Sequence, residues 1–212
     1  MSELNLVLYP AAAGGQRFVY EIARGSVGLI PLGRNRWDID RDDFAYKIPR
    51  DKNADLEVSN KNSKYMAMHR APHTYESSHS VEYYQKLFSK YDRLIVYILE
   101  PETKQQMKCL VHMAAHKVQG PVFEKGFKKC LKIIEHLDPP AWAFNCLRSR
   151  FRYYYSTGKH ARDMSPFKVD EIIHINPFDL WTGKYKLPWH SDTWENYCEK
   201  NLHFFEKNCL HY

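Results

Sequence analysis

The chain has 212 residues, the length of one ordinary domain with a large core. Its formal net charge of +6 favours an acidic partner such as nucleic acid, although the same excess also serves solubility. Its five cysteines include no Cys-x-x-Cys pair and are odd in number, and these two facts together argue against a disulfide framework and a structural zinc site.

The first half of the chain alternates short apolar runs with turn signals. Leu4 to Tyr9 is predicted to be a strand, and Gln16 to Arg24 a helix. Three brief strand-like stretches follow, the last of which ends at Ser59. Ser80 is a good N-cap, and apolar residues after it recur at helical spacing, which predicts a helix from Ser80 to Tyr91. Leu94 to Leu99 is a continuous apolar run, which predicts a central strand covered on both faces.

The second half contains a block of basic and aromatic residues, Trp142 to Tyr155. Before it, Met107 to Met113 is expected to form a strand beside Leu94 to Leu99. After it, Glu171 to Ile175 is predicted to be a short strand, and a last helix is predicted from about Asp192.

Between residues 11 and 100, a helix that carries Glu21 is followed by three strands, a helix and a strand. This α-β-β-β-α-β order resembles the core of the PD-(D/E)XK nuclease superfamily. The resemblance implies an α+β fold in which helices flank a mixed central sheet, as in a restriction-endonuclease core, over residues 1–105. Residues 106–212 are then a basic, aromatic-rich C-terminal extension packed on the same domain.

The same resemblance implies a metal site built from acidic residues. In this family, an acid on the first helix, an acid at a strand end and an acid-x-lysine on the next strand hold one or two magnesium ions. The implied metal ligands are Glu21, Asp38, Asp40 and Glu57. Hard oxygen ligands of this kind hold Mg²⁺ or Mn²⁺, and the metal makes a bound water more acidic.

The implied catalytic residues are Asp40, Glu57 and Lys61. The family has lysine, glutamate or glutamine two positions after the second acid, where this chain has Ser59, so Lys61 or Lys64 must replace it. Asp55 and Glu57 lie two positions apart in a predicted strand and therefore point to the same face, which suits metal binding. The alternative is that these carboxylates are ordinary surface residues on a turn-rich sheet.

A second pattern of the nuclease kind stands nearer the C-terminus. The segment Ile173 to Asn176 looks like the start of a His-Asn-His nuclease motif, in which one histidine activates water and the others hold the metal. The motif continues in His190, Asn196 and His203. Ile173 stands where that family has a carboxylate or a second histidine before the base. A further acid-x-lysine pattern, Glu102 to Lys104, follows a proline, and its alternative is a capped loop.

Basic residues beyond the middle of the chain form its best nucleic-acid signal. We expect nucleic acid to contact Arg148, Arg150, Arg152, Lys159 and Arg162. Alternating arginines on a strand face one side, where they follow a phosphate backbone while neighbouring tyrosines stack on bases or fill the core. The alternative is a sheet with a charged outer face and a tyrosine-rich inner face.

Together these patterns predict a metal-dependent nuclease, a hydrolase that cleaves phosphodiester bonds in DNA or RNA. Its partner is then nucleic acid, and its cofactor is magnesium or manganese. The alternative is a non-enzymatic viral or phage protein, structural or inhibitory, that binds a host protein or nucleic acid through a basic aromatic surface, since aromatic residues anchor interfaces. Both a protein partner and a homo-oligomer are compatible with that alternative.

The sequence carries no pattern for export or membrane insertion. Its N-terminus lacks a basic segment followed by an apolar run, and Leu94 to Leu99, the longest apolar stretch, is too short to span a bilayer. We therefore expect a cytoplasmic location, in the host cytoplasm if the protein is viral, and no membrane partner. The run Ala13 to Gln16 lacks the lysine and serine of a P-loop, so nucleotide hydrolysis is not expected.

Overall fold

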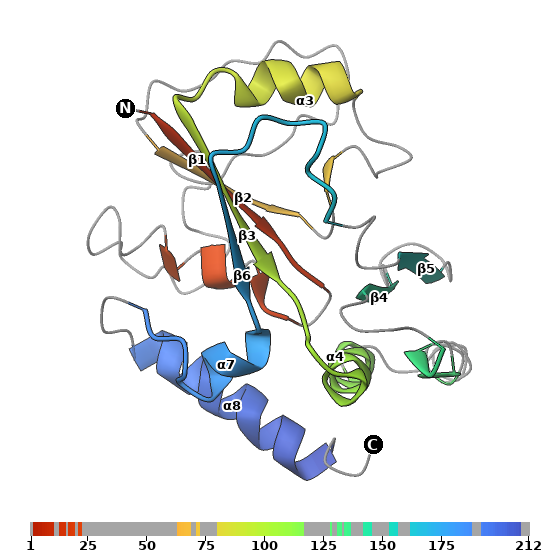
Figure 1. Ribbon diagram of the computed structural model, residues 1–212. Coiled ribbons are helices and arrows are strands. Elements are labelled where there is room, and N and C mark those ends of the chain that lie inside the picture. Colours follow the sequence, from red (N-terminus) through yellow and green to blue (C-terminus); the bar gives the residue numbers. More distant parts are fainter. Residues whose placement is uncertain are drawn as a thin grey trace.

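A four-stranded parallel β-sheet forms the centre of the fold (Figure 1). The residues that the computed structural model describes are 2–10, 13–15, 17–19, 21–22, 63–68, 71–72, 80–116, 128, 131–132, 134–136, 142–145, 153–156, 162–187 and 192–208. Within them, the strands lie in the order β2-β1-β3-β6, and every neighbouring pair is parallel. The strands are β1 (Glu3–Leu8), β2 (Ser63–Met68), β3 (Arg93–Leu99) and β6 (Glu171–Ile175).

The two central strands are buried on both faces, which explains their continuous apolar sequences. Every residue from Leu4 to Leu8 is buried, and in β3 only Arg93 and Tyr97 are partly exposed. β1 pairs with β2 on one side and with β3 on the other. The prediction that Leu94 to Leu99 is a central strand covered on both faces is confirmed.

The strand order creates a topological switch point between β1 and β3. From β1 the chain passes to β2 on one side, and from β3 it passes to β6 on the other. In open parallel sheets, ligands bind beyond the carboxyl ends of the strands at such a point. The carboxyl edge of this sheet is therefore the expected location of a functional site.

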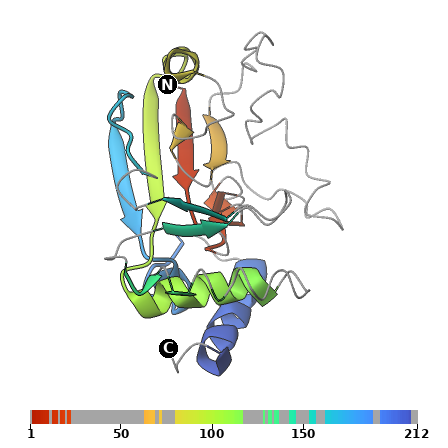
Figure 2. The same ribbon diagram turned by 90° about the vertical axis from the view of Figure 1, so that its right-hand side faces the viewer.

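Helices lie at both ends of the strands. α3 (Val81–Phe88) lies near the amino ends, whereas α4 (Lys104–His116), α7 (Pro177–Trp181) and α8 (Asp192–Asn208) lie beyond the carboxyl ends (Figure 2). β4 (Trp142–Asn145) and β5 (Tyr153–Ser156) form a separate antiparallel pair. Residues 15, 17–19 and 21–22, after β1, are also helical. No helix in the described residues combines the length and apolar character needed to cross a membrane.

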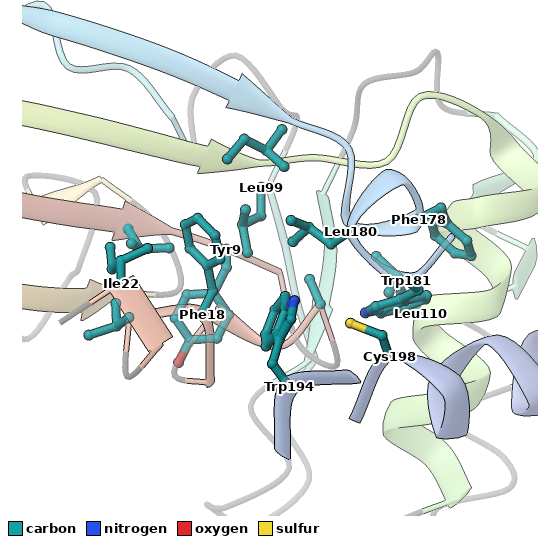
Figure 3. Packing of buried hydrophobic residues seen from close by; sticks show 14 of the residues in the cluster. Tyr9, Phe18, Ile22, Leu99, Leu110, Phe178, Leu180, Trp181, Trp194 and Cys198 are labelled. Carbon is teal, nitrogen blue, oxygen red and sulfur yellow. The ribbon is translucent and has the colours of Figure 1, made fainter. Parts of the chain in front are cut away.

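Apolar layers cover both faces of the sheet. One face, with alternate residues of β1 such as Leu6, packs against α3 and against Met164 and Phe167. On the other face, Leu99 packs with residues of the helical segment after β1 and of α7 and α8. Figure 3 shows this second layer, in which the rings of Phe18 and Trp194 have centroids 6.2 Å apart. Each layer contains residues from both halves of the chain, so both halves pack against the sheet.

The structure combines helices with a β-sheet, as the broad α+β prediction requires. We expected a mixed sheet, but the four described strands are all parallel, because each strand returns to the sheet through a long crossover rather than a hairpin. The restriction-endonuclease-like core stays a prediction, since residues 23–62, on which its middle strands fall, lie outside the described residues.

The predicted strand at Met107 to Met113 is wrong, because these residues belong to α4. Buried Met107, Leu110 and Met113 recur every three positions and so share one face of a helix. Thr103 and Gln106 begin this helix with a capping box: the Thr103 hydroxyl accepts a hydrogen bond from the Gln106 N–H at 3.1 Å, and the Gln106 side-chain oxygen accepts one from the Thr103 N–H at 3.3 Å. The segment Glu102 to Lys104 is therefore the cap and first residue of α4, rather than the capped loop stated as an alternative above.

Candidate active site

Two polar side chains, Glu100 and His174, meet at the carboxyl edge of β3 and β6. His174 stands opposite Ile98 in the parallel register of these strands. Glu100 lies two positions after Ile98, directly beyond the end of β3. Because residues two apart in a strand point the same way, Glu100 emerges on the same face as His174.

The two side chains form a carboxylate–imidazole pair. His174 Nδ1 lies 2.8 Å from Glu100 Oε1. A carboxylate only accepts hydrogen bonds, so Nδ1 carries the hydrogen and donates it, which leaves the lone pair of Nε2 free in the neutral ring. The His174 side chain is 55% exposed and the Glu100 side chain only 13% exposed. A largely buried carboxylate thus orients a histidine whose ring reaches solvent.

Arg162 places a positive charge on the other oxygen of this carboxylate. Its Nη1 forms an ion pair with Glu100 Oε2, and its side chain is only 18% exposed. The segment after Arg162 is fixed on the sheet. Met164 and Phe167 are buried in the apolar layer that includes α3, and the backbone N–H of Asp170 donates to the carbonyl of Leu94 at 3.0 Å. The fold therefore anchors the guanidinium beside the pair.

Burial is the first cause that lowers the pKa of His174 below the usual 6.5, and the positive charge of Arg162 is the second. His174 is therefore neutral at pH 7 and able to accept a proton. Burial also lowers the pKa of Arg162 from its ordinary value, but arginine stays protonated in proteins. The cluster thus combines a neutral base, a carboxylate that orients it and a fixed cation.

Asn176, two residues after His174, has a structural role. It is 8% exposed and is the N-cap of α7, where its Oδ1 accepts a hydrogen bond from the N–H of Phe178 at 3.0 Å. The other members of the predicted His-Asn-His motif fall elsewhere: Asn196 and His203 are exposed on α8, and His190 lies outside the described residues.

The predicted acidic metal ligands are described only at Glu21. Its carboxylate is fully buried and pairs with Arg17 at 2.8 Å, one helical turn earlier. Asp38, Asp40, Glu57 and Lys61 lie outside the described residues, and Lys64 lies in β2. In the part of the chain that the structure describes, no group of three or more His, Cys, Asp or Glu side chains is placed to hold a metal ion.

Of the predicted nucleic-acid contacts, Arg162 belongs to the cluster at the carboxyl edge. Arg148, Arg150, Arg152 and Lys159 lie outside the described residues.

Glu100 is the residue of the candidate site that sequence reasoning missed. In the His-Asn-His motif, the acid that accompanies the base would stand at Ile173. In the structure the acid is Glu100, which lies 74 residues from His174 in the sequence. One signal did point to it, because an acid directly after a buried apolar strand stands at the carboxyl edge of a parallel sheet.

Comparison of the chain with protein-family models, curated proteins and solved structures finds no match. The chemistry of the site is therefore derived from its own residues. A neutral histidine with one nitrogen held by a carboxylate and the other free is the usual arrangement of a general base. A cation 18% exposed next to it suits a substrate that carries negative charge.

Proposed function

We propose that the protein hydrolyses phosphodiesters and that His174 is the general base. The observation that carries this proposal is the hydrogen bond from His174 Nδ1 to Glu100, which leaves Nε2 free on a half-exposed ring beside Arg162. General-base catalysis of this kind contributes about 100- to 10,000-fold to a rate.

Each residue has a distinct role in the proposed reaction. Nε2 of His174 takes a proton from a water molecule as the water oxygen bonds to phosphorus and the bond from phosphorus to the leaving oxygen breaks. The imidazolium then gives that proton to the leaving oxygen, directly or through a water molecule, so that the leaving group departs as an alcohol. Glu100 fixes the tautomer and stabilises the imidazolium while it exists. Arg162 offsets the charge that develops on the phosphoryl oxygens.

The net charge of the whole chain favours DNA or RNA as the substrate, because an excess of +6 attracts a phosphate backbone. The site lies at the carboxyl edge of the parallel sheet between β3 and β6, next to the switch point of β1 and β3. The proposal retains the predicted nuclease activity but places its base on β6. The Mg²⁺ or Mn²⁺ site of Asp38, Asp40 and Glu57 stays a separate prediction.

The test is cleavage of single- and double-stranded DNA and RNA by the wild type and by His174→Gln. The glutamine variant should be slower by about 100- to 10,000-fold. His136→Gln is the matched control, because His136 is exposed and follows a different helical segment. The wild-type rate should rise with pH along a limb whose apparent pKa lies below 6.5. Equal activity of His174→Gln and the wild type would contradict the proposal, and binding without cleavage by the wild type would favour the non-enzymatic alternative.

The same assay separates the two predicted sites. Reactions run with Mn²⁺, with Mg²⁺ and with a chelator show whether a metal is required. Glu57→Gln keeps the shape of the side chain but removes its charge. Loss of cleavage in Glu57→Gln together with a metal requirement would support the acidic site. Full activity of Glu57→Gln with a chelator present, and its loss in His174→Gln, would leave His174 as the base without that metal.

A further inference from the structure

One side-chain oxygen, Oε1 of Gln106, joins the two chain segments that carry Glu100 and His174. Gln106 lies in the first turn of α4. Its Oε1 accepts hydrogen bonds from the N–H of Glu102 at 2.7 Å, from the N–H of Thr103 at 3.3 Å and from Nδ2 of Asn176 at 3.3 Å. Because all three partners are donors, the atom that faces them is the oxygen of the amide and not its nitrogen.

The donors come from both sides of the candidate site. Glu102 and Thr103 lie in the turn between Glu100 and α4, and Asn176 lies two residues after His174. Asn176 is itself held in place, because it is 8% exposed and its Oδ1 caps α7. The backbone N–H of Glu100 also donates to the carbonyl of Ile175 at 3.0 Å, which aligns the main chains at the end of the sheet. Beyond that point the chain leaves the sheet toward α4 from β3 and into α7 from β6 (Figure 1), and Gln106 joins these two segments.

We propose that Gln106 is a positioning residue for the carboxylate–imidazole pair. By binding both segments it holds Glu100 at the distance and angle at which its carboxylate orients His174. The catalytic part of this inference rests on the proposed function, whereas its geometric part does not. Small errors in such an arrangement are costly, since a misplacement of about 1 Å reduces a rate by about a hundredfold.

Three variants separate positioning from helix capping. Gln106→Met keeps the length of the side chain but has no oxygen, so it loses both the cap and the link to Asn176. Asn176→Ser keeps an N-cap for α7 but loses the amide donor, so it breaks the link and leaves the capping box of α4 intact. Thr103→Ala is the matched control, because it removes the hydroxyl half of that capping box and keeps the link.

The first measurement is an NMR titration of His174 in the free protein, which needs no substrate. Gln106→Met and Asn176→Ser should both move the pKa of His174 up toward 6.5, because a less firmly held ring is better solvated. Both should also lose the hydrogen-bonded Nδ1–H signal. Thr103→Ala should lower the thermal midpoint while the titration stays as in the wild type. Gln106→Glu keeps an acceptor oxygen at this position, so it should keep the Nδ1–H signal that Gln106→Met loses.

The second measurement is the kinetics of cleavage. Gln106→Met and Asn176→Ser should lose about tenfold to a hundredfold in kcat with KM unchanged. Thr103→Ala should keep the wild-type kcat. A wild-type titration of His174 in Asn176→Ser would overturn the positioning role, even if Gln106→Met fails to fold. If the wild type cleaves no phosphodiester but the titrations shift as described, the proposed function fails and the positioning role stands.

Discussion

His174 is a residue whose protonation the folded protein opposes. Its pKa in the fold lies below 6.5, first because of burial and then because of Arg162, whereas in an unfolded chain it titrates near 6.5. As the pH falls, the unfolded state therefore takes up the proton first. The stabilisation by the neutral ring is complete above about pH 6.5 and is lost as the pH falls through the folded-state pKa.

We therefore expect the free energy of unfolding to fall less with acid in His174→Gln than in the wild type. Urea unfolding at about pH 7.5 and about pH 5 measures the difference. His136→Gln, which removes an exposed histidine elsewhere in the chain, serves again as the control. An identical loss of stability in His174→Gln and the wild type would show that the fold does not oppose protonation of this ring.

Cys198 is a second residue whose chemistry the fold changes. Burial in α8, with a smaller contribution from the charge of Glu21, raises the pKa of its thiol to about 12. Because only the thiolate is a good nucleophile, iodoacetamide should leave Cys198 unmodified in the native protein and alkylate it after unfolding. Peptide mass spectrometry with and without denaturant measures this. Rapid alkylation of Cys198 in the native protein would contradict the burial of this side chain.

At the scale of elements, Gly14 determines how closely the turn after β1 approaches α8. Its φ is +80°, and a Cβ atom built there would lie 2.0 Å from the hydroxyl oxygen of Tyr197. Gly183 has a φ of +75° but nothing within 4 Å of the same position. Both glycines thus have a left-handed backbone that favours glycine. Of these two, only Gly14 also lacks room for a Cβ atom.

We expect both glycine-to-alanine variants to be less stable, but by different amounts. The left-handed backbone alone costs about 1–2 kcal/mol, which applies to Gly183→Ala. Gly14→Ala should lose about 1–3 kcal/mol more, because the ring of Tyr197 must move. Denaturant unfolding of the two variants measures the difference. Equal losses would mean that the turn and α8 do not pack closely.

Local signals account for the elements that were predicted correctly. The Ser80 side chain caps α3 as expected, and the apolar run of β3 marks it as central. α4 was missed because its apolar residues also fit the alternation of a strand. These residues are Met107, Cys109, Val111 and Met113. The capping box of Thr103 and Gln106 indicates a helix instead, because its two hydrogen bonds fix the first helical turn just before Met107.

Local sequence patterns predict only one of the two central residues of the candidate site. His174 stands in a recognisable motif, but Glu100 becomes its neighbour only through the parallel register of β3 and β6. Parallel strands are joined by long crossovers, so no local pattern states which of them will be adjacent. The pair depends on where β6 docks, and the sequence near either residue does not contain that information.

At the scale of the whole molecule, the sheet is the common core of both halves of the chain, and β1 lies within it. Leu6 is fully buried in β1, so Leu6→Ala should cost about 2–5 kcal/mol of stability. Ile172→Ala is the control, because Ile172 is 46% exposed and its loss should cost less than about 1 kcal/mol. Thermal and denaturant unfolding compare the two. A similar loss in both would place β1 outside the core.

The separation of 74 residues between Glu100 and His174 also has a consequence in time. A chain that is still being synthesised can pair β1, β2 and β3 long before β6 exists, and it then has the carboxylate but no base. Parallel sheets with non-local contacts form slowly, because the entropy of loop closure is lost before strand pairing contributes favourable free energy. On dilution from denaturant, helical signal should return first, and cleavage should return only with the slowest phase, when β6 joins the edge of β3.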